Sequence, residues 1–457
     1  MSAFTISVNA VTFTVDTQAD ATVMATMSLA DFIRTKTPFK ATKVTCDVGG
    51  CGACIVALVS INPVTNQPSV RAINACLALL FSLQGAAILT NEGLGSPSEG
   101  TIHPIQKMLA EKSGTQCGYC ASGFVMSLFA FLKDHPSPTP LEIEQLLDGN
   151  LCRCTGYRPI LEAFKTFAGT FCENVPSAST GKDALDATAV SGEWLSDVSC
   201  LKTKCCKRRG MAIEVEDCAR HLDAKHLHDD PQAPKAPCKQ FHTCRSLKNS
   251  KNGSVIWQDV ATITDLCFWV QHYAGLNVMI TANATSLGVY REKASVDVFL
   301  SIAPIASLAT ITQAPSTGVV VGAMVAITDV IEYLKSCVPP QAGQSAHFPQ
   351  AARHLERVAS RAIRNRATLV GNLVLTHKHQ VPGNSFPSDA AMVMLGIGAM
   401  VTLLNVVTQK SQNLTMTAFF ATSLDLQIVT AVTIPWSAVP GETFLTYKMA
   451  QRQVNSH

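Results

Sequence analysis

The chain has 457 residues, a formal net charge of +3 and 15% charged residues. This length allows about three domains, each large enough to bury a core of its own. With so small a net charge, neither a nucleic-acid partner nor a membrane-surface partner is expected.

Four cysteines near the beginning of the chain follow the spacing of plant-type ferredoxins. Cys46, Cys51 and Cys54 form a C-x4-C-x2-C motif, and Cys76 follows at a distance. Thiolates are soft ligands suited to iron, so this spacing predicts a 2Fe-2S cluster. The three glycines between Cys46 and Cys54 are expected to take positive φ, which brings backbone N–H groups close to the inorganic sulfides.

A second set of cysteines consists of two close pairs, namely Cys117 with Cys120 and Cys152 with Cys154. Residues 123–133 lack helix breakers and are apolar nearly all round, and residues 141–147 resume a helical pattern. Each pair is therefore expected at the start of a helix, where the positive helix end stabilises negative charge. A second 2Fe-2S cluster is predicted, with zinc or buried free thiols as alternatives. No segment resembling a signal peptide precedes these motifs. We therefore expect a cytoplasmic location and do not expect disulfides.

The composition changes from residue 173 to residue 250, where periodicity fades into Ser, Asp, Lys and His, and this range is predicted to be a flexible linker. Six cysteines lie in it, near His221, His226 and His228. Since the cysteines lack paired C-x2-C spacing and the adjacent Cys205 and Cys206 cannot easily bind one metal, free thiols are expected rather than zinc.

Order returns near Trp257, where a strand, an amphipathic helix and a second strand are predicted within residues 257–283. Further on, residues 390–407 approach the length of a membrane span but contain two glycines, a threonine and an asparagine. We interpret this stretch as a buried helix followed by a buried strand, with a membrane span as the minor alternative.

Several of these segments resemble the xanthine dehydrogenase and aldehyde oxidase family of molybdo-flavoenzymes. The strings CDVGGCGACIV, INACLALL, HPIQK, QCGYCASGFVMSL and GNLCRCTGYRPILEAF are similar to its iron-sulfur region, and residues 281–291 and 363–375 resemble its two flavin-contacting segments. The resemblance implies an α+β multidomain fold. Its parts would be a β-grasp, ferredoxin-like 2Fe-2S domain (1–90), a helical-bundle 2Fe-2S domain (91–172), the linker (173–250), an α+β FAD-binding domain (251–410) and an incomplete carboxy-terminal flavin subdomain (411–457).

The resemblance also implies roles for individual residues. The eight cysteines match the ligands of two 2Fe-2S clusters, and Gln116 matches a glutamine that contacts the pterin of the molybdenum cofactor. The implied FAD-binding residues are Ala282, Asn283, Thr285, Gly288, Gly371, Asn372, Asp389 and Lys448. Some positions depart from the family pattern, since Asn283 replaces a glycine, Ala284 an asparagine, and Arg366 and Val370 two small residues. These departures imply weakened FAD binding.

The function implied is the electron-transfer portion of a molybdenum-containing oxidoreductase of the aldehyde oxidase type. The large region that holds molybdenum in the family has no counterpart in this sequence, so a molybdenum-cofactor domain or subunit is the expected partner, and a homodimer is a further expectation. Without that region the chain is expected to be inactive on substrate. The segments GVYR, GNLVLTHKH and FPSD are typical of aldehyde oxidases, particularly the arthropod branch, with oxygen as acceptor. A xanthine dehydrogenase-like fragment using NAD and a standalone iron-sulfur protein with a decayed flavin site remain alternatives.

Overall fold

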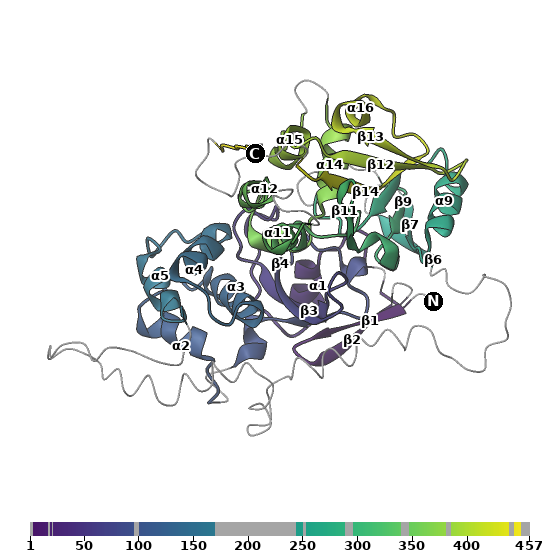
Figure 1. The fold of residues 1–457 in the computed structure, drawn as a ribbon. Helices are drawn as coiled ribbons and strands as arrows, with labels where there is room; N and C mark the ends of the chain where they lie inside the picture. The colour runs from purple at the N-terminus through teal and green to yellow at the C-terminus, as the bar shows by residue number, and fades with distance from the viewer. Residues whose placement is uncertain are drawn as a thin grey trace.

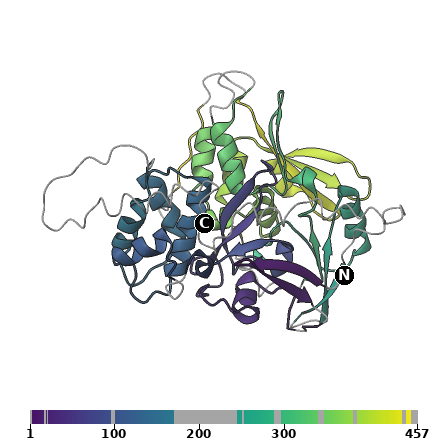
Figure 2. The ribbon, with the colours of Figure 1, turned by 90° about the horizontal axis from the view of Figure 1, so that it is seen from below.

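The computed structural model describes residues 3–16, 19–20, 22–95, 100–169, 244–249, 253–287, 296–339, 347–380, 385–437 and 443–448. They form three regions in chain order, drawn purple, blue, and teal to yellow in Figure 1. Seen from below in Figure 2, the purple sheet lies between the blue helices and the green and yellow elements. Most of the predicted linker, residues 173–243, lies outside the described residues, whereas a strand already begins at Cys244.

The first region is a mixed five-stranded sheet with strand order β2-β1-β5-β3-β4, in which only β1 and β5 are parallel. Its elements are β1 (Ala3–Val8), β2 (Val11–Asp16), α1 (Leu29–Lys36), β3 (Ile55–Ile61), β4 (Pro68–Asn74), η1 (Leu80–Leu83), β5 (Ala87–Leu89) and η2 (Asn91–Leu94). Alternate residues of β3 point to opposite faces. Val56 packs in the core beneath α1, while Ala57 packs against the second region, so the sheet is covered on both sides.

The second region is helical and consists of α2 (Pro104–Glu111), α3 (Ala121–Asp134), α4 (Pro140–Leu146), η4 (Leu147–Gly149) and α5 (Arg158–Lys165). Residues 122–132 of α3 are all buried, because this helix lies between the sheet of the first region and the other helices. That position explains its apolar character all round and confirms the helix predicted at 123–133.

The third region contains two sheets, with strand orders β6-β7-β9-β8 and β10-β11-β14-β12-β13. Its strands are β6 (Cys244–Asn249), β7 (Gly253–Asp259), β8 (Val278–Thr281), β9 (Val298–Ser301), β10 (Ile311–Ala314), β11 (Gly318–Gly322), β12 (Met400–Asn405), β13 (Ser411–Thr415) and β14 (Gln427–Pro435). Its helices are α9 (Ile263–His272), η8 (Ala306–Leu308), α11 (Ile327–Ser336), α12 (Phe348–Leu355), α13 (Arg361–Arg364), α14 (Leu369–Lys378), α15 (Asp389–Gly396) and α16 (Met416–Ala421). The predicted order of strand, helix and strand within 257–283 is confirmed. The second sheet continues across residue 410, because β12 pairs with both β13 and β14.

Buried polar contacts fix the first region to the third. Arg71 of β4 forms an ion pair with Asp329 of α11, and Asn62 Nδ2 donates to the same carboxylate at 3.0 Å. The amide of Asn365 donates to the carbonyl of Ala72 at 2.8 Å. These contacts hold the end of β4, which leads to Cys76, against the third region.

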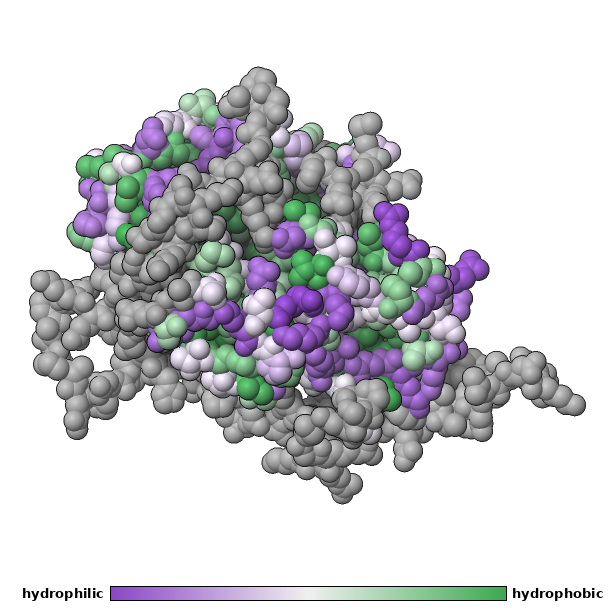
Figure 3. Space-filling view, turned by 180° about the vertical axis from the view of Figure 1, so that it is seen from behind, coloured by the Kyte–Doolittle hydropathy of each residue, from purple (hydrophilic) through white to green (hydrophobic). Residues whose placement is uncertain are grey.

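The long apolar stretch at 390–407 forms most of helix α15 followed by strand β12, as predicted. Within the described ranges, no helix has the length and apolar character needed to cross a bilayer. On the face shown in Figure 3, hydrophobic and hydrophilic residues are interspersed over the coloured surface.

Candidate cofactor sites

The first cysteine set lies in the loop before β3 and just after β4. Cys51, Cys54 and Cys76 are buried, and Cys46 is half-buried. A hydrogen bond between the Cys46 and Cys51 thiols, together with hydrogen bonds from backbone amides of the loop, lowers the pKa of Cys46 to about 5. Cys76 hydrogen-bonds Cys54, and this bond together with burial raises the pKa of Cys76. The four thiols therefore lie as two contacting pairs, with amide donors directed at them.

Glycines give this loop its shape. Gly49 has φ +77°, and a Cβ there would lie 2.4 Å from Leu77 Cδ1; Gly52 has φ +68°, and a Cβ there would lie 2.3 Å from the carbonyl of Gly149. Any side chain at either position meets both a disfavoured backbone and a clash. The prediction of positive φ is confirmed for these two glycines and is wrong for Gly50, which is not among the residues with positive φ.

The second set lies at two helix starts. Cys120 immediately precedes α3, and Cys152 and Cys154 lie a few residues before α5. The Cys154 and Cys117 sulfurs are 3.5 Å apart, and Cys120 hydrogen-bonds Cys152. Cys117 and Cys154 are exposed and Cys152 is buried. The predicted position at helix starts is confirmed, and this set too forms two contacting pairs.

The two loops that carry the sets touch each other. The backbone N–H of Leu151 donates to the carbonyl of Cys51 at 2.8 Å, and the amide of Asn150 donates to the carbonyl of Gly52 at 3.3 Å. In α3, Gly123 has no room for a side chain, since a Cβ would lie 2.1 Å from the Gly52 carbonyl. Main chain of one cysteine loop thus packs directly on main chain of the other.

This donor arrangement fits a binuclear cluster in each set. Four thiolates hold a 2Fe-2S cluster, and two pairs side by side can each serve one iron. Among the described residues, no group of three or more His, Cys, Asp or Glu side chains converges on a point suited to a single ion. The alternative of zinc in the linker concerns residues that lie outside the described ranges, apart from Cys244, of whose side chain nothing is described.

A cavity of about 630 Å³ lies between the first cysteine loop and the third region. It is lined by residues 48–50 of the cysteine loop, residues 278–286 from β8 onward, most of residues 363–378 around the start of α14, residues 385–389 before α15, and residues 424 and 426–429 at the start of β14. Six predicted FAD-binding residues come together in this lining, namely Ala282, Asn283, Thr285, Gly371, Asn372 and Asp389.

The remaining predicted cofactor residues lie elsewhere. Gly288 falls outside the described residues. Lys448 does not line the cavity, but its buried ammonium pairs with Asp389 and donates to the carbonyl of Arg357. Gln116 is exposed beside Cys117 and does not line the cavity.

The lining carries more positive than negative charge. Among the described residues of the lining, the cationic side chains are Arg364, Arg366 and Lys378, and the one carboxylate, Asp389, is paired with Lys448. Helix α14 begins at this wall with Thr368 as its cap, accepting from the N–H of Gly371 at 2.9 Å. A cationic wall and a helix amino end both suit a ligand with a dianionic pyrophosphate, such as FAD. The basic residues were missed as candidates because neither their spacing nor their neighbours in sequence showed that they face one cavity.

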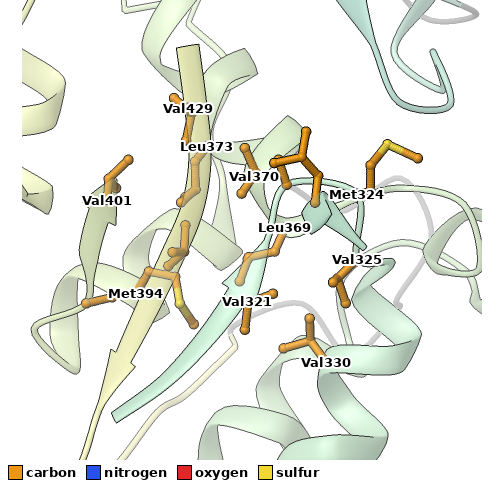
Figure 4. Packing of buried hydrophobic residues seen from close by; sticks show 14 of the residues in the cluster. Val321, Met324, Val325, Val330, Leu369, Val370, Leu373, Met394, Val401 and Val429 are labelled. Atoms are coloured by element: carbon orange, nitrogen blue, oxygen red, sulfur yellow. The ribbon is translucent and has the colours of Figure 1, made fainter. Parts of the chain in front are cut away.

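Two of the departures from the family pattern can now be placed. Val370 lines the cavity and also packs in the core of the third region; Figure 4 shows it between Leu373 and Met324. Ala284 takes φ +54° in the loop after β8. The left-handed conformation is unfavourable for alanine and is adopted more readily by glycine or asparagine. The turn at this position is therefore strained.

The chain is similar to several known proteins. Residues 90–165 match a 2Fe-2S binding domain, and residues 249–437 match the FAD binding domain in molybdopterin dehydrogenase. Probable aldehyde oxidase 1 of Oryza sativa subsp. japonica is 31% identical over 448 residues, covering 93% of this chain and 30% of that protein. Abscisic-aldehyde oxidase of Arabidopsis thaliana is 29% identical over 94% of this chain and 30% of its own length. The aldehyde oxidoreductase structure from Desulfovibrio gigas is 30% identical, covers 36% of this chain and 17% of that chain, and has a TM-score of 0.31.

The chain therefore spans about 30% of the length of these plant relatives. Both matched domains occur in the order and at the places where the structure has its second and third regions. The chain belongs to the xanthine dehydrogenase and aldehyde oxidase family, of which it represents the iron-sulfur and FAD-binding portion.

Proposed function

We propose that the chain is the electron-transfer portion of an aldehyde oxidase-type oxidoreductase, with a 2Fe-2S cluster at each cysteine set and FAD in the cavity. Bound there, the clusters would carry single electrons and FAD would collect them in pairs. The chain's own residues would hold the clusters through eight thiolates and enclose the flavin among residues 282–286, 370–372 and 386–389.

The observation that carries this proposal is the continuity between the first cysteine loop and the cavity. Val48, Gly49 and Gly50 lie between Cys46 and Cys51 in sequence and also line the cavity. A ligand in the cavity would therefore contact the loop that holds the first set. In the other direction, this loop is hydrogen-bonded to the loop of the second set through Cys51 and Leu151. The two cysteine sets and the cavity are therefore connected through main-chain segments that contact one another.

The exposure of the second cysteine set supports the proposal that a molybdenum-containing domain or subunit binds there. Gln116, Cys117 and Cys154 are exposed at the surface, whereas three thiols of the first set are buried. Electrons that enter the chain from outside would reach the second set first. Oxygen is our proposed acceptor, and the arthropod-like branch remains a prediction, since the relatives described above are plant enzymes.

The test uses the full chain loaded anaerobically with iron, sulfide and FAD. After rapid mixing with a substoichiometric one-electron reductant, we expect cluster absorbance to bleach first and the flavin absorbance to follow by intramolecular transfer. The observed rate constant of the flavin phase should be independent of protein concentration. If the chain binds clusters and FAD but this rate constant rises in proportion to protein concentration, transfer within one molecule is contradicted.

A standalone iron-sulfur protein with a decayed flavin site is the second candidate. The strained Ala284 and the bulk of Val370 at the cavity wall favour it. The same preparation separates the two candidates, because this one requires full iron and sulfide content with no bound FAD.

A further inference from the structure

Arg366 lies buried in the cavity wall where the first and third regions meet. Its side chain is only 6% exposed and lines the cavity. One guanidinium nitrogen donates to Ser82 Oγ of the first region at 2.9 Å, while the buried Nε donates to no partner. Within the described part of the chain, no carboxylate pairs with this residue, and burial alone lowers its pKa to about 10.

Two other buried arginines of the described residues have their guanidinium groups better satisfied than Arg366. The neighbouring Arg364 is buried in the same wall, but its guanidinium donates to the carbonyls of Val358 and Ala359. Arg71, also largely buried, is paired with Asp329. Removing a charge from water without compensation is unfavourable, so the folded chain must offset that cost elsewhere.

The surroundings of Arg366 suit an anion. Two residues later Thr368 caps α14, a helix of ten residues whose amino end faces the cavity. The amide of Asn283 donates to the carbonyl of Arg366 at 2.8 Å, which brings the loop of small residues at 282–286 beside the arginine. Helix amides, small residues and a fixed guanidinium together form a place where phosphate oxygens can approach closely.

We infer that Arg366 is an anion-binding residue that supplies the counter-charge for the pyrophosphate of FAD. This inference rests on the proposed function and identifies the part of the flavin that this side chain recognises. The pyrophosphate is the only fully charged group of FAD near neutral pH, and a guanidinium binds phosphate oxygens with directed hydrogen bonds. Sequence alone suggested that an arginine here weakens the flavin site; its charge and burial indicate that it takes part in binding.

The experiment compares FAD with riboflavin, which has the same ring and no phosphate, on the full chain carrying its clusters. Arg366→Met keeps much of the side-chain volume and removes the charge, and Arg366→Lys keeps the charge. Arg353→Met is the matched control, because Arg353 lies exposed on α12 away from the cavity lining. Affinities come from quenching of flavin fluorescence, and inorganic pyrophosphate serves as a competitor.

We expect Arg366→Met to weaken FAD about tenfold or more, while riboflavin changes by less than about twofold. Arg366→Lys should retain part of the affinity, and Arg353→Met should bind both flavins like the wild type. Pyrophosphate should compete with FAD on the wild-type chain and much less on Arg366→Met. Without flavin, Arg366→Met should melt at or above the wild-type Tm, because it removes an uncompensated buried charge.

Equal weakening of FAD and riboflavin would overturn the inference, as would an unchanged FAD affinity or a lower Tm of the flavin-free variant. These results would indicate a structural role for Arg366 or none. Failure of the proposed function is distinguishable, because the wild-type chain would then bind neither flavin, and that result would overturn the inference as well.

Discussion

Each of the two cysteine sets has four thiols, but the sets differ in how deeply these thiols are buried. The first set is enclosed between a sheet and the cavity, with three of its thiols buried, whereas the second set opens to the surface through Cys117 and Cys154. An external partner can approach an exposed cluster site more closely than a buried one. Under the proposed function, the difference in burial makes the second set the one nearer to a partner and the first set the one nearer to the cavity.

The largest expected effect comes from removing one ligand of each set. Cys51→Ser and Cys120→Ser should each abolish one electron paramagnetic resonance signal and about two of the roughly four iron atoms per chain. Only Cys51→Ser should also stop flavin reduction by the remaining cluster, because the cavity borders the first set. Loss of both signals from one substitution would show that the sets do not assemble separately.

The buried ion pair between Arg71 and Asp329 should have the next largest effect. Asp329→Ala leaves an uncompensated charge on Arg71 and should lower the free energy of unfolding by about 3–5 kcal/mol, measured by urea denaturation. Glu356→Ala is the control, because its pair with Lys335 is exposed, and it should cost less than about 1 kcal/mol. Equal effects of the two substitutions would mean that the pair does not fix the first region to the third.

The contact between the two cysteine loops can be tested at Gly123. Gly123→Ala places a Cβ 2.1 Å from the Gly52 carbonyl, and this overpacking should cost about 1–3 kcal/mol despite the better helix propensity of alanine. Gly396→Ala is the control in another helix, where the nearest atom is a Phe444 ring carbon at 3.3 Å. It should be neutral or stabilising by up to about 1 kcal/mol. Thermal denaturation of both variants gives the comparison, and a stable Gly123→Ala would show that the loops separate readily.

The smallest effect is expected at the strained turn beside the cavity. Ala284→Gly relieves the φ of +54° and should raise the free energy of unfolding by about 0.5–1 kcal/mol. Ala282→Gly, two residues earlier at a position without positive φ, should lower it by a similar amount. Urea denaturation of the flavin-free chain measures both changes, and the same sign for both variants would refute strain at Ala284.

Local sequence spacing predicted much of the candidate site, whereas the features that depend on long-range contacts could not be predicted from it. The cysteine motifs indicated which thiols belong together, because ligands of one cluster are close in sequence or flank regular elements. By contrast, Arg71 and Asp329 are 258 residues apart, and no local pattern indicates that they pair. From the sequence, Arg366 could be assessed only as a bulky residue within a motif, since its burial and the absence of a paired carboxylate among the described residues are properties of the folded chain. The close approach of Gly52 and Gly123 likewise depends on how α3 packs against the first sheet.

The hydrogen bond from Leu151 to Cys51 has a consequence for biosynthesis. The ribosome completes the first set at Cys76, but the loop around Cys51 gains its packing partner only when Leu151 emerges, about 75 residues later. At 5–20 residues per second this interval lasts roughly 4–15 s. During that time the nascent chain has all four thiols of the first set but lacks the packing of Asn150 and Leu151 on the first loop. Under the proposed function, a cluster delivered in this interval meets a loop that is still open on that side.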